Sequence, residues 1–470
     1  MRKKIGWLLG IGLVLGILGC GPAGEENGLE NVAGSDSEFD LSQSHATALN
    51  TKIKTKPALE AHSTTAKFTF ACNQSPCTFK CSLDSAAWKT CTSPKTYKKL
   101  KGGDHNFQVK AIKSGKTDKT PAGYDWTISD VWLPVSATNA PLGVQFSGKV
   151  WTNTEVIIWG GFDDTGVGDV NYGAKYDPAT DSWTATSSVN APEARDYFST
   201  VWDTVNSQMI VWGGRNTVGT DLNTGARYNP ASNSWTPTNT TNAPDARDQH
   251  NAVWTGTEMI IWAGSGVLNT GGKYDPTGNS WTATSTTNAP GLIRFRYLAF
   301  WTGSEMLIWG GFNGTNFLNS GGKYNPATNS WTDISSANAP AGRDYPAGVW
   351  TGTEMIVWGG YDTEFLNTGG VYDLAGNSWT ATSTGTNVPA ARNWHSAVWD
   401  TVNSQMIIWG GVCDAGNLNT GGKYDPDTDS WTSTSTVNAP SGRGTHVAVW
   451  AEDRMIIWGG THAAGGRYWP

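Results

Sequence analysis

The sequence predicts an all-β chain in which seven similar four-stranded units follow a small, separate β module. Three observations predict this organisation. A short apolar strand that ends in Trp and two small residues, as in EMIIWAG and QMIVWGG, recurs throughout residues 131–470. Each copy is followed by a segment such as GGKYD and then by one such as SWTAT. Before the repeats, residues 61–130 alternate apolar and polar residues in short runs between Gly, Ser, Pro and Asp, which indicates short strands joined by tight turns.

The N-terminus has the pattern of a secretory signal peptide. Three basic residues at positions 2–4 precede the apolar run IGWLLGIGLVLGILG, which is too short for a membrane span. The run ends in ILGC, which resembles the lipobox of bacterial lipoproteins. This resemblance implies removal of residues 1–19, lipidation of Cys20, and a lipid anchor in the bacterial cell envelope, at the outer membrane or cell surface. The alternative is an ordinary cleaved signal peptide with a chance cysteine. Residues 20–60, rich in Gly, Ser, Glu, Asn and Thr, are predicted to form a flexible tether.

Four cysteines lie close together in the module at residues 61–130: Cys72, Cys77, Cys81 and Cys91. In an exported protein this density predicts disulfides, and the spacing fits the paired CxxC pattern of a zinc site badly. Four cysteines allow three pairings, although the four residues between Cys72 and Cys77 suit a hairpin bridge. The segments CTFKCSLDSAAWKTCTSP and HNFQVKAI resemble bacterial Ig-like modules. The resemblance implies a small β-sandwich that acts as a spacer or adhesive unit, with a bridge between Cys81 and Cys91.

The repeats in residues 131–470 have a period near fifty residues. The Trp residues that end the apolar strand are Trp159, Trp212, Trp262, Trp309, Trp358, Trp409 and Trp458, with gaps of 53, 50, 47, 49, 51 and 49. A glycine pair after an apolar strand, then a Tyr, then a Trp about seven residues later is the pattern of kelch repeats, which these units resemble. The resemblance implies a β-propeller with one four-stranded blade per repeat.

Each unit has four segments that are predicted to be strands, here called a, b, c and d. In the third unit these are QHNAVW, EMIIW, GGKYD and SWTATS. Strand b is apolar on both faces, as expected for a strand sandwiched between neighbouring sheets. The Pro in YDP and YNP ends strand c and begins a turn. The Trp residues recur at fixed places in every unit, and they are therefore interpreted as core between blades rather than as a sugar-binding ladder.

The two ends of the repeat array predict how it closes. The chain ends in GGRYWP, a strand c without a strand d, whereas residues 131–137 begin with VWLP and match a strand d without a preceding unit. We therefore predict a seven-bladed propeller whose last blade is completed by residues 131–137, which leaves no open sheet edge.

The connections at one end of the units carry most of the sequence variation. The b–c connections range from GGFDDTGVGDVN to GGYDTEFLN, and varied loops on a rigid scaffold are common binding sites. The d–a connections at the same end carry the arginines of the pattern NAPxxR, which are candidate ligand-binding residues for a carboxylate or sulfate: Arg195, Arg247, Arg343, Arg392 and Arg443. In the fourth unit the equivalent is Arg294 or Arg296, and the first unit has Val144. The alternative is that each guanidinium ties loop carbonyls together.

Three histidines, His250, His395 and His446, occupy one equivalent position in their units and suggest a copper or iron site. His250 lies in the third unit, and the other two lie in the sixth and seventh. Because metal–nitrogen bonds are about 2 Å long, the three cannot share an ion without distortion. We therefore predict no metal and no cofactor.

The net charge of −7 argues against a dedicated nucleic-acid binder. The units are nearly identical, and VWDTVNSQMI occurs twice without change. An active site needs an asymmetric set of groups, so this similarity favours a non-catalytic surface that recognises a protein or a glycan. The alternative is an extracellular sugar-active enzyme, because copper radical oxidases and sialic acid mutarotases are also kelch propellers. Cys413 is the one cysteine of the repeats, and no ligand set for such an oxidase is visible around it.

Overall fold

The computed structural model describes residues 48–470 except 164–166, 266–268 and 292–293. The predicted signal peptide, Cys20 and the predicted tether up to residue 47 lie outside the described residues, so lipidation remains a prediction. All regular elements of the described residues are β-strands, which confirms the all-β prediction. The same residues contain no helix that is long and apolar enough to cross a membrane.

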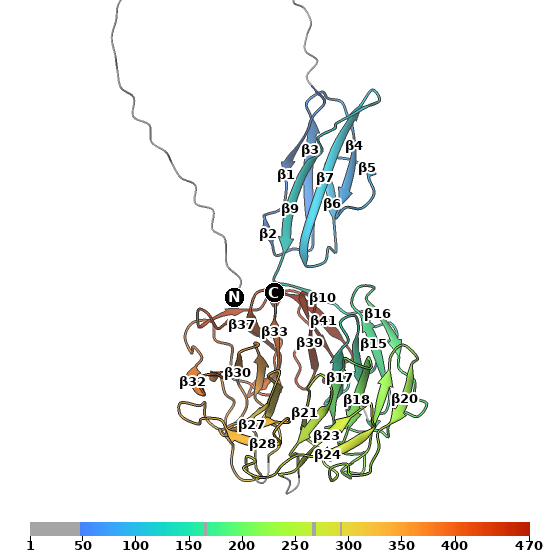
Figure 1. Cartoon of the computed structure of the whole chain (residues 1–470). Helices are drawn as coiled ribbons and strands as arrows, with labels where there is room; N and C mark the ends of the chain where they lie inside the picture. Colours follow the sequence, from blue (N-terminus) through green and yellow to red (C-terminus); the bar gives the residue numbers. More distant parts are fainter. Residues whose placement is uncertain (1–47, 164–166, 266–268, 292–293) are drawn as a thin grey trace, which may run out of the picture. The chain divides into compact units, whose positions relative to one another are not determined.

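Two sheets build the N-terminal module (Figure 1). The smaller sheet has the order β1 (Thr51–Thr55), β3 (Ala66–Cys72), β6 (Lys95–Tyr97). The larger sheet has the order β2 (Glu60–Ala61), β9 (Ala122–Ile128), β7 (Gly103–Lys113), β4 (Thr78–Leu83), β5 (Lys89–Cys91), with β8 (Lys116–Thr117) also paired to β7. Alternate residues of β7 are buried, as expected for strands with one face on a core.

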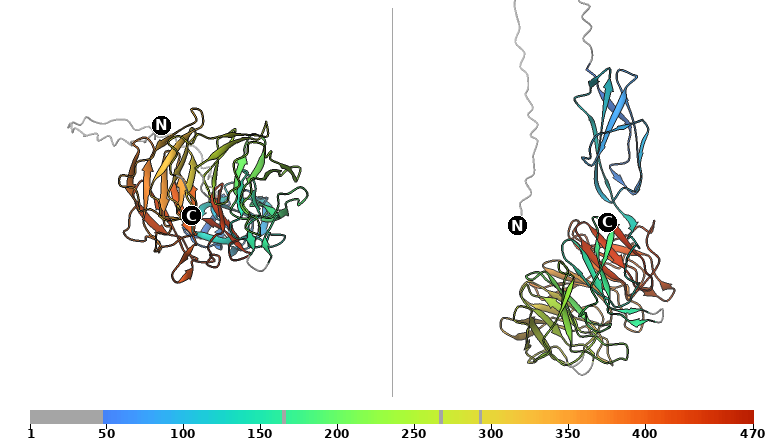
Figure 2. Two further views of the ribbon diagram at one scale, coloured as in Figure 1. Left: turned by 90° about the horizontal axis from the view of Figure 1, so that it is seen from below. Right: turned by 90° about the vertical axis from the view of Figure 1, so that its right-hand side faces the viewer.

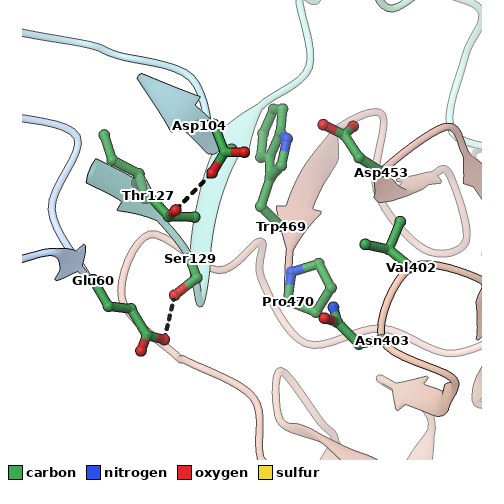
Figure 3. A pocket seen from close by; sticks show the side chains of 11 residues that line it. Glu60, Asp104, Thr127, Ser129, Val402, Asn403, Asp453, Trp469 and Pro470 are labelled. Atoms are coloured by element: carbon green, nitrogen blue, oxygen red, sulfur yellow. Dashed lines mark hydrogen bonds between the residues drawn. The ribbon is translucent and has the colours of Figure 1, made fainter. Parts of the chain in front are cut away.

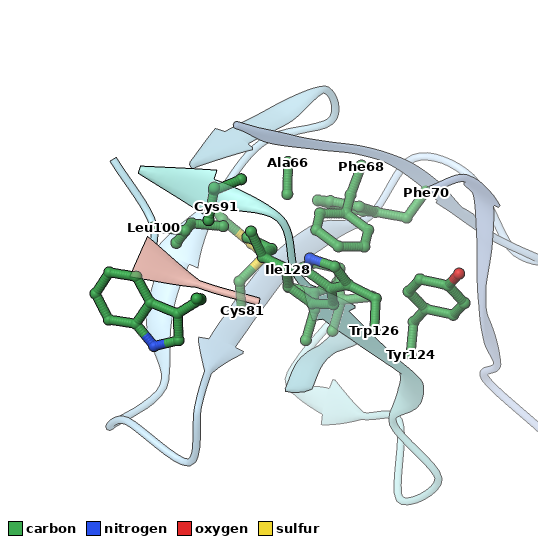
Figure 4. Packing of buried hydrophobic residues seen from close by; sticks show 13 residues of the cluster. Ala66, Phe68, Phe70, Cys81, Cys91, Leu100, Tyr124, Trp126 and Ile128 are labelled. Carbon is green, nitrogen blue, oxygen red and sulfur yellow. A yellow bond between two sulfur atoms is a disulfide. The ribbon is translucent and has the colours of Figure 1, made fainter. Parts of the chain in front are cut away.

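The aromatic core of the module is centred on Phe68 and Phe107, whose rings stack with centroids 4.0 Å apart. Figure 4 shows Cys81 and Cys91 joined by a disulfide within the same cluster as Phe68. A second disulfide joins Cys72 and Cys77. The structure therefore contains the two disulfides that the cysteine spacing and the resemblance implied.

The first strand of the module lies within the segment that was predicted to be a tether. Strand β1 pairs with β3, and the Thr51 amide and hydroxyl both donate to Asp118 Oδ2, at 2.7 and 2.6 Å. The polar composition of residues 20–60 concealed this strand, because its polar end is buried through hydrogen bonds rather than through apolar contacts. The ordered module thus begins about ten residues before the predicted boundary.

Residues 131–470 form seven four-stranded antiparallel sheets with the spatial order a-b-c-d (Figure 1, Figure 2). We number the units by their sheets. Unit 1 is β11 (Gly148–Trp151), β12 (Val156–Trp159), β15 (Gly173–Asp177) and β16 (Ser182–Ala185). Unit 2 is β17 (Ser199–Asp203), β18 (Gln208–Trp212), β19 (Gly225–Asn229) and β20 (Ser234–Pro237). Unit 3 is β21 (Asn251–Trp254), β22 (Met259–Trp262), β23 (Gly271–Asp275) and β24 (Ser280–Ala283). Unit 4 is β25 (Leu298–Trp301), β26 (Met306–Trp309), β27 (Gly321–Asn325) and β28 (Ser330–Asp333).

Units 5 to 7 repeat this plan. Unit 5 is β29 (Ala347–Trp350), β30 (Glu354–Trp358), β31 (Gly369–Asp373) and β32 (Ser378–Ala381). Unit 6 is β33 (Ser396–Asp400), β34 (Gln405–Trp409), β37 (Gly421–Asp425) and β38 (Ser430–Ser433). Unit 7 is β39 (Val447–Ala451), β40 (Arg454–Trp458), β41 (Gly465–Trp469) and β10 (Val131–Pro134). Two small hairpins lie in b–c connections: β13 (Phe162–Asp163) with β14 (Gly168–Asp169), and β35 (Val412–Cys413) with β36 (Gly416–Asn417).

The strand that completes unit 7 comes from the N-terminal side of the repeats, as the sequence predicted. Strand β10 pairs with β41 so that Val131 lies opposite Trp469 and Pro134 opposite Gly466 (Figure 1). This pairing joins residues that lie more than 300 positions apart in the chain, and it gives the last sheet a fourth strand.

Tryptophans fill the contacts between successive units. The strand-b Trp of each unit packs against the strand-d Trp of the next unit, with ring centroids 4.8 to 5.3 Å apart. The contact between Trp458 and Trp183 joins unit 7 to unit 1 in the same way. Strand a of each unit also lies beside strand a of the next, and β39 lies beside β11. The strand-b Trp rings are fully buried, so the interpretation of these residues as core is correct.

Candidate functional site

The arginines predicted to bind a ligand are buried and hold their own b–c connections together. In unit 2, Arg195 Nη1 donates to Gly213 O at 2.9 Å and to Thr224 O at 2.8 Å, and Nη2 donates to the Thr224 hydroxyl. Gly213 follows strand b and Thr224 precedes strand c, so one guanidinium joins the two ends of the loop. Corresponding bonds to the two loop ends are made by Arg247, Arg294, Arg343, Arg392 and Arg443.

These arginines also link neighbouring units through their backbone. The second glycine of the pair after strand b donates its N–H to the carbonyl of the arginine in the next unit, as Gly214 does to Arg247 at 2.9 Å. Gly214 has φ of +89° and its position has no room for a Cβ, because Asp196 O would lie 2.5 Å away. Unit 1 has Val144 in place of the arginine, and the Val144 carbonyl accepts the corresponding hydrogen bond from the N–H of Gly460 in unit 7. The arginines are at most 1% exposed, and burial lowers the pKa of Arg195 and Arg392 to about 10. This geometry favours the second of the two interpretations from the sequence, in which each guanidinium ties loop carbonyls together, over a role in binding a carboxylate or sulfate.

The three equivalent histidines also lie between units rather than around a common centre. His250 Nε2 lies 2.9 Å from Ser199 Oγ of the preceding unit, and His446 Nε2 lies 2.9 Å from Ser396 Oγ. Burial lowers the pKa of His250 and His395 to about 3, with a smaller contribution from Arg247 and Arg392 respectively. Among the described residues, no group of three or more His, Cys, Asp or Glu side chains is placed to hold a metal ion.

A set of seven residues at the loop end of strand a forms a collar. Each collar residue lies two positions after the arginine of its unit, or after Val144 in unit 1, and all have φ between +46° and +60°. The collar residues are Phe146, Tyr197, Gln249, Arg296, Tyr345, Trp394 and Thr445. Left-handed backbone is rare in bulky residues, and each instance costs about 1–3 kcal/mol. The fold therefore imposes one strained conformation seven times and varies only the side chain that it presents.

Backbone hydrogen bonds connect the collar residues of units 2 and 3, of units 4 and 5, and of units 6 and 7. Gln249 N donates to Tyr197 O at 2.9 Å, and Thr445 N donates to Trp394 O at 3.0 Å. The Thr445 hydroxyl also donates to Gln145 Oε1, which joins unit 7 to unit 1. These bonds link collar residues of neighbouring units in pairs, so the collar residues are not seven independent loop tips.

Aromatic side chains pack against one another within the collar. Phe146 stacks on Tyr197 with ring centroids 4.2 Å apart, and Trp394 lies edge-on to Tyr345 at 5.7 Å. The hydroxyls of Tyr197 and Tyr345 lie near enough to influence each other's pKa, although they come from units 2 and 5. Burial, followed by the nearby hydroxyl of Tyr345, raises the pKa of Tyr197. Trp394 remains 37% exposed, so the collar offers an accessible aromatic surface.

Two arginines lie over the two collar tyrosines in similar ways. The Arg296 guanidinium lies 4.7 Å from the ring centre of Tyr345, and its Nη1 lies 3.3 Å from Asp344 Oδ2. Arg215 lies 4.8 Å from the ring centre of Tyr197, and its Nε donates to Asp196 Oδ1 at 3.1 Å. In each case the aspartate directly precedes the tyrosine and holds the cation on the ring.

The aspartates of these clusters are buried. Burial raises the pKa of Asp196 to about 6, although the hydrogen bond from Arg215 acts in the opposite direction. Burial also raises the pKa of Asp344, again against Arg296. Side chains held by buried charges in this way are preorganised, which is a common property of binding surfaces.

A pocket of about 280 Å³ opens beside the collar. Its lining includes the collar residues of units 1 to 5, together with the following residues Ser147, Phe198, His250, Asn251, Tyr297 and Pro346. The pocket is near the lower end of the size range of small-molecule sites. It combines aromatic faces with the planar polar groups of Gln249 and Arg296, which suits stacking and hydrogen bonding.

The Ser–His contacts do not have the arrangement of a catalytic triad. Ser199 and His250 are 7% and 4% exposed, and His250 Nδ1 has no hydrogen-bond partner among the described residues. A nucleophile–base pair needs an acceptor that orients the base, and access for the substrate. These contacts instead pack successive units together.

A second pocket, of about 420 Å³, is lined by residues such as Glu60, Asp104, Asp453 and Trp469 (Figure 3). Several of its polar groups are already paired. The Thr127 hydroxyl donates to Asp104 Oδ1 at 2.6 Å, and the Ser129 hydroxyl donates to Glu60 Oε1 at 2.9 Å (Figure 3). This pairing makes it a weaker candidate than the collar.

The collar was missed by the sequence analysis, which considered the residues on either side of it. The signal that could have revealed it is variability at a fixed position. The residue before each collar position is Asp in three units, whereas the collar position itself changes from Phe to Tyr, Gln, Arg, Trp and Thr. The structure also separates the two candidates of unit 4, because Arg294 ties the loop and Arg296 belongs to the collar.

Comparisons with protein families agree with the repeat pattern. Residues 148–345 match a family model described as the KLHDC2/KLHL20/DRC7 Kelch-repeats domain. Residues 267–466 match one described as the Attractin/LZTR1 beta-propeller. The chain contains kelch-repeat β-propeller domains. Kelch propellers typically mediate protein binding. A search of curated proteins found no match to the chain.

Proposed function

We propose that the protein is a non-catalytic recognition protein whose collar binds a partner protein. The observation that carries this proposal is the repeated left-handed conformation at seven positions with different side chains. Backbone strain is retained where the surrounding structure enforces it, and it concentrates at functional sites. A uniform scaffold with variable tips is also the arrangement by which rigid folds present binding residues.

The collar has the composition of a protein-binding surface. Tyr, Trp and Arg are the residues that contribute most to binding energy at protein interfaces. Four of these residues gather here, namely Tyr197, Arg296, Tyr345 and Trp394, and their side chains are held in place by neighbours. A preorganised surface loses little conformational entropy when a partner binds.

A glycan is the second candidate ligand. The stacked pair Phe146 and Tyr197 and the exposed ring of Trp394 offer flat apolar faces beside Gln249 and Arg296. A sugar ring can lie on such a face while its hydroxyls bond to the planar polar groups. The pocket volume of about 280 Å³ suits one or two sugar residues better than a long chain.

We further propose that the seven sheets are the blades of one closed propeller, that residues 61–130 form the main part of an Ig-like spacer, and that lipid on Cys20 anchors both to the bacterial cell envelope. The pairing of β10 with β41 and the contact of Trp458 with Trp183 support closure. The two disulfides support an exported protein, since such bonds persist in oxidising compartments.

Replacement of Cys20 by Ser tests the proposed lipid anchor. It should move the protein from the membrane fraction to the soluble fraction of the producing cells.

Site-specific photo-crosslinking tests the recognition surface. A photoreactive phenylalanine analogue at position 394 replaces one exposed aromatic residue by another, and the same analogue at Val205 provides the control. Val205 is 62% exposed and lies in the turn between strands a and b of unit 2, at the other end of the strand from the collar. The expected result is a discrete adduct from position 394 on intact cells and none from position 205.

The adduct identifies the ligand class by mass spectrometry. A peptide adduct supports the partner-protein proposal, and a carbohydrate adduct supports the glycan. Equal labelling from both positions, or no adduct from position 394 in folded protein, would refute recognition by the collar.

A further inference from the structure

The N-terminal module is the basic part of an otherwise acidic protein. Residues 48–130 contain 14 lysines, no arginine and six acidic residues, whereas residues 131–470 contain 16 basic and 28 acidic residues. Among the described residues, no lysine of the module forms an ion pair, whereas Lys175 and Lys273 of the repeats lie 3.6 and 3.7 Å from glutamates. The positive charge of the module is therefore not compensated by direct contacts.

Strand β7 runs the length of the module and defines its two ends (Figure 1). Its first residue, Gly103, lies opposite Ile128, just before the strand that leads into the repeats. Its last residue, Lys113, lies in the hairpin with β8, and eleven residues of strand span about 35 Å. Strand β1 begins beside this hairpin, because Ala111 N donates to the Thr51 hydroxyl at 2.8 Å. We call the end that holds the β7–β8 turn and the start of β1 the tether end.

Six lysines gather at the tether end. Lys80 of β4 lies directly opposite Lys110 of β7, and Lys113 lies opposite Lys116 of β8. Among the described residues, the acidic residue at this end is Asp118, which is 2% exposed and accepts hydrogen bonds from the hydroxyls of Thr51 and Thr120. The six lysines are exposed or half-buried, and they are Lys52, Lys80, Lys110, Lys113, Lys116 and Lys119.

The other acidic residues of the module lie near the opposite end. Asp104 is the second residue of β7, and Asp125 lies opposite Asn106. Asp84 N donates to Asn106 O, and the remaining acidic residues, Glu60 and Asp130, lie beside the end of β9 and directly after it. These carboxylates offset the lysines of that end and leave the tether end positive.

The lysines of the tether end repel one another. Lys80 and Lys110 are direct cross-strand neighbours, a placement that is unfavourable for like charges. The ring of Trp88 holds Lys110, with Nζ 3.9 Å from the ring centre, without neutralising its charge. A surface of opposite sign relieves this repulsion, so the tether end is suited to meet many negative charges at once.

We infer that the tether end of the module docks on an anionic lipid bilayer. The lysines form an extended charged surface, and a lysine acts as a hydrated point charge without the fork that favours single phosphates. Thirty residues separate Cys20 from Thr51, and a flexible chain of that length spans about 30 Å. The inference rests in this step on the proposed lipid anchor, which brings the tether end close to the bilayer. A lipid chain and a basic surface together bind a membrane more stably than either alone.

Sedimentation with lipid vesicles tests the docking surface separately from the lipid. The protein is the mature chain from residue 20 with the substitution C20S, which has no lipid and contains every described residue. At about 0.1 M salt it should bind vesicles of phosphatidylcholine and phosphatidylglycerol in equal parts, but not vesicles of phosphatidylcholine alone. Because a lysine near an anionic bilayer strengthens binding about fivefold, the variant K116Q/K119Q should bind about 25-fold more weakly.

The matched control K98Q/K99Q removes the same charge from the opposite end of the module. These lysines directly follow Tyr97, which lies opposite Ala66 at the start of β3, whereas the end of β3 lies opposite Thr51. The control should bind the anionic vesicles within about twofold of the original protein, since its charges lie beyond the screening distance. Lys116 and Lys119 are exposed, so their replacement should leave the melting temperature unchanged.

Four results would overturn the inference. Equal weakening by the two double variants would mean that binding follows net charge rather than the tether end. Absence of binding to the anionic vesicles, or equal binding to phosphatidylcholine alone, would exclude an anionic bilayer as the partner. Release by inorganic phosphate but not by chloride of equal ionic strength would indicate a phosphate site. Tighter binding to duplex DNA than to the vesicles would indicate a nucleic-acid surface. None of these results depends on lipidation of Cys20, which cell fractionation tests separately.

Discussion

Acid should destabilise the repeats through the three histidines that are buried between units. An unfolded histidine has a pKa near 6.5, whereas burial lowers the pKa of His250 and His395 to about 3 and that of His446 in the same direction. Below pH 6.5 the unfolded chain takes up protons that the folded chain cannot accept. Stability from each histidine is therefore complete above pH 6.5 and is lost as the pH falls from 6.5 toward 3.

The size of the effect follows from the two pKa values. At pH 5 a histidine with a folded pKa of about 3 and an unfolded pKa of about 6.5 costs about 2 kcal/mol of unfolding free energy relative to pH 8. Asp196 acts in the opposite direction, because its folded pKa of about 6 exceeds the unfolded value near 3.9. Asp196 therefore raises the unfolding free energy by about 1.4 kcal/mol at pH 5 relative to pH 8. The acid response of the whole protein is a sum of such terms, so one histidine has to be isolated by substitution.

The variant H395F isolates one histidine with little other change. Phe198 occupies the equivalent position in unit 2, so the repeat itself accepts phenylalanine there. His395 also faces Ala347 where His250 and His446 face serines, so the substitution breaks no serine contact. Urea unfolding followed by tryptophan fluorescence at pH 8, 6 and 5 should show that the variant loses about 2 kcal/mol less than the original protein between pH 8 and pH 5. Parallel pH profiles for the two proteins would refute the reasoning, because they would mean that His395 titrates normally in the folded state.

Three further predictions follow from the contacts of other residues. The variant R392M removes the donor to Gly410 O and Thr420 O, and it should lower the unfolding free energy by about 3 kcal/mol. The control K273M breaks a partly exposed ion pair with Glu258 and should cost less than about 1 kcal/mol. Normal stability with loss of a bound ligand would instead favour a ligand-binding arginine. The variants W394G and W394A should both weaken partner binding, and W394G should be the more stable by about 1 kcal/mol, because both lose the ring but only glycine accepts the left-handed backbone without strain. Calorimetry that finds W394A at least as stable as W394G would contradict strain at the collar. Loss of the Cys81–Cys91 bridge should lower the unfolding free energy of the module by about 2.7 kcal/mol, and loss of the Cys72–Cys77 bridge should lower it by about 2 kcal/mol. The difference is expected because the two bridges close loops of 10 and 5 residues, and a longer loop gains more entropy when it is opened. If Cys-to-Ser variants show the reverse order, loop-closure entropy is not the cause.

The fold was predictable because its signals are local and repeated seven times. The apolar strand b, the glycines after it and the Pro after strand c each give a direct physical reason for one element, and β10 was found from an unmatched strand at each end of the array. Strand β1 was missed because Thr51 is buried by polar bonds to Asp118, which leave no apolar pattern in the sequence.

The candidate site was harder to predict because a residue's role depended on where its side chain points. Arg195 and Arg296 are both arginines in d–a connections, yet one is buried on loop carbonyls and the other lies on the ring of Tyr345. A non-glycine residue in left-handed conformation has no compositional signal, since Phe146 and Trp394 would not be chosen for such a turn on propensity. The binding residues therefore break the local rules that made the scaffold predictable.

This contrast explains how nearly identical units can carry a specific surface. The arginine ties, the glycine pair and the Trp contacts fix the backbone of each unit in the same way, and they tolerate little change. The collar residue is held by its backbone, so its side chain can change from Phe to Arg or Thr without altering the fold. Asymmetry then needs only seven substitutions, one for each unit, while the rest of the repeat stays uniform. Near-identity of the units is thus compatible with a specific recognition surface, because the differences between units are concentrated at the collar and in the neighbouring b–c connections.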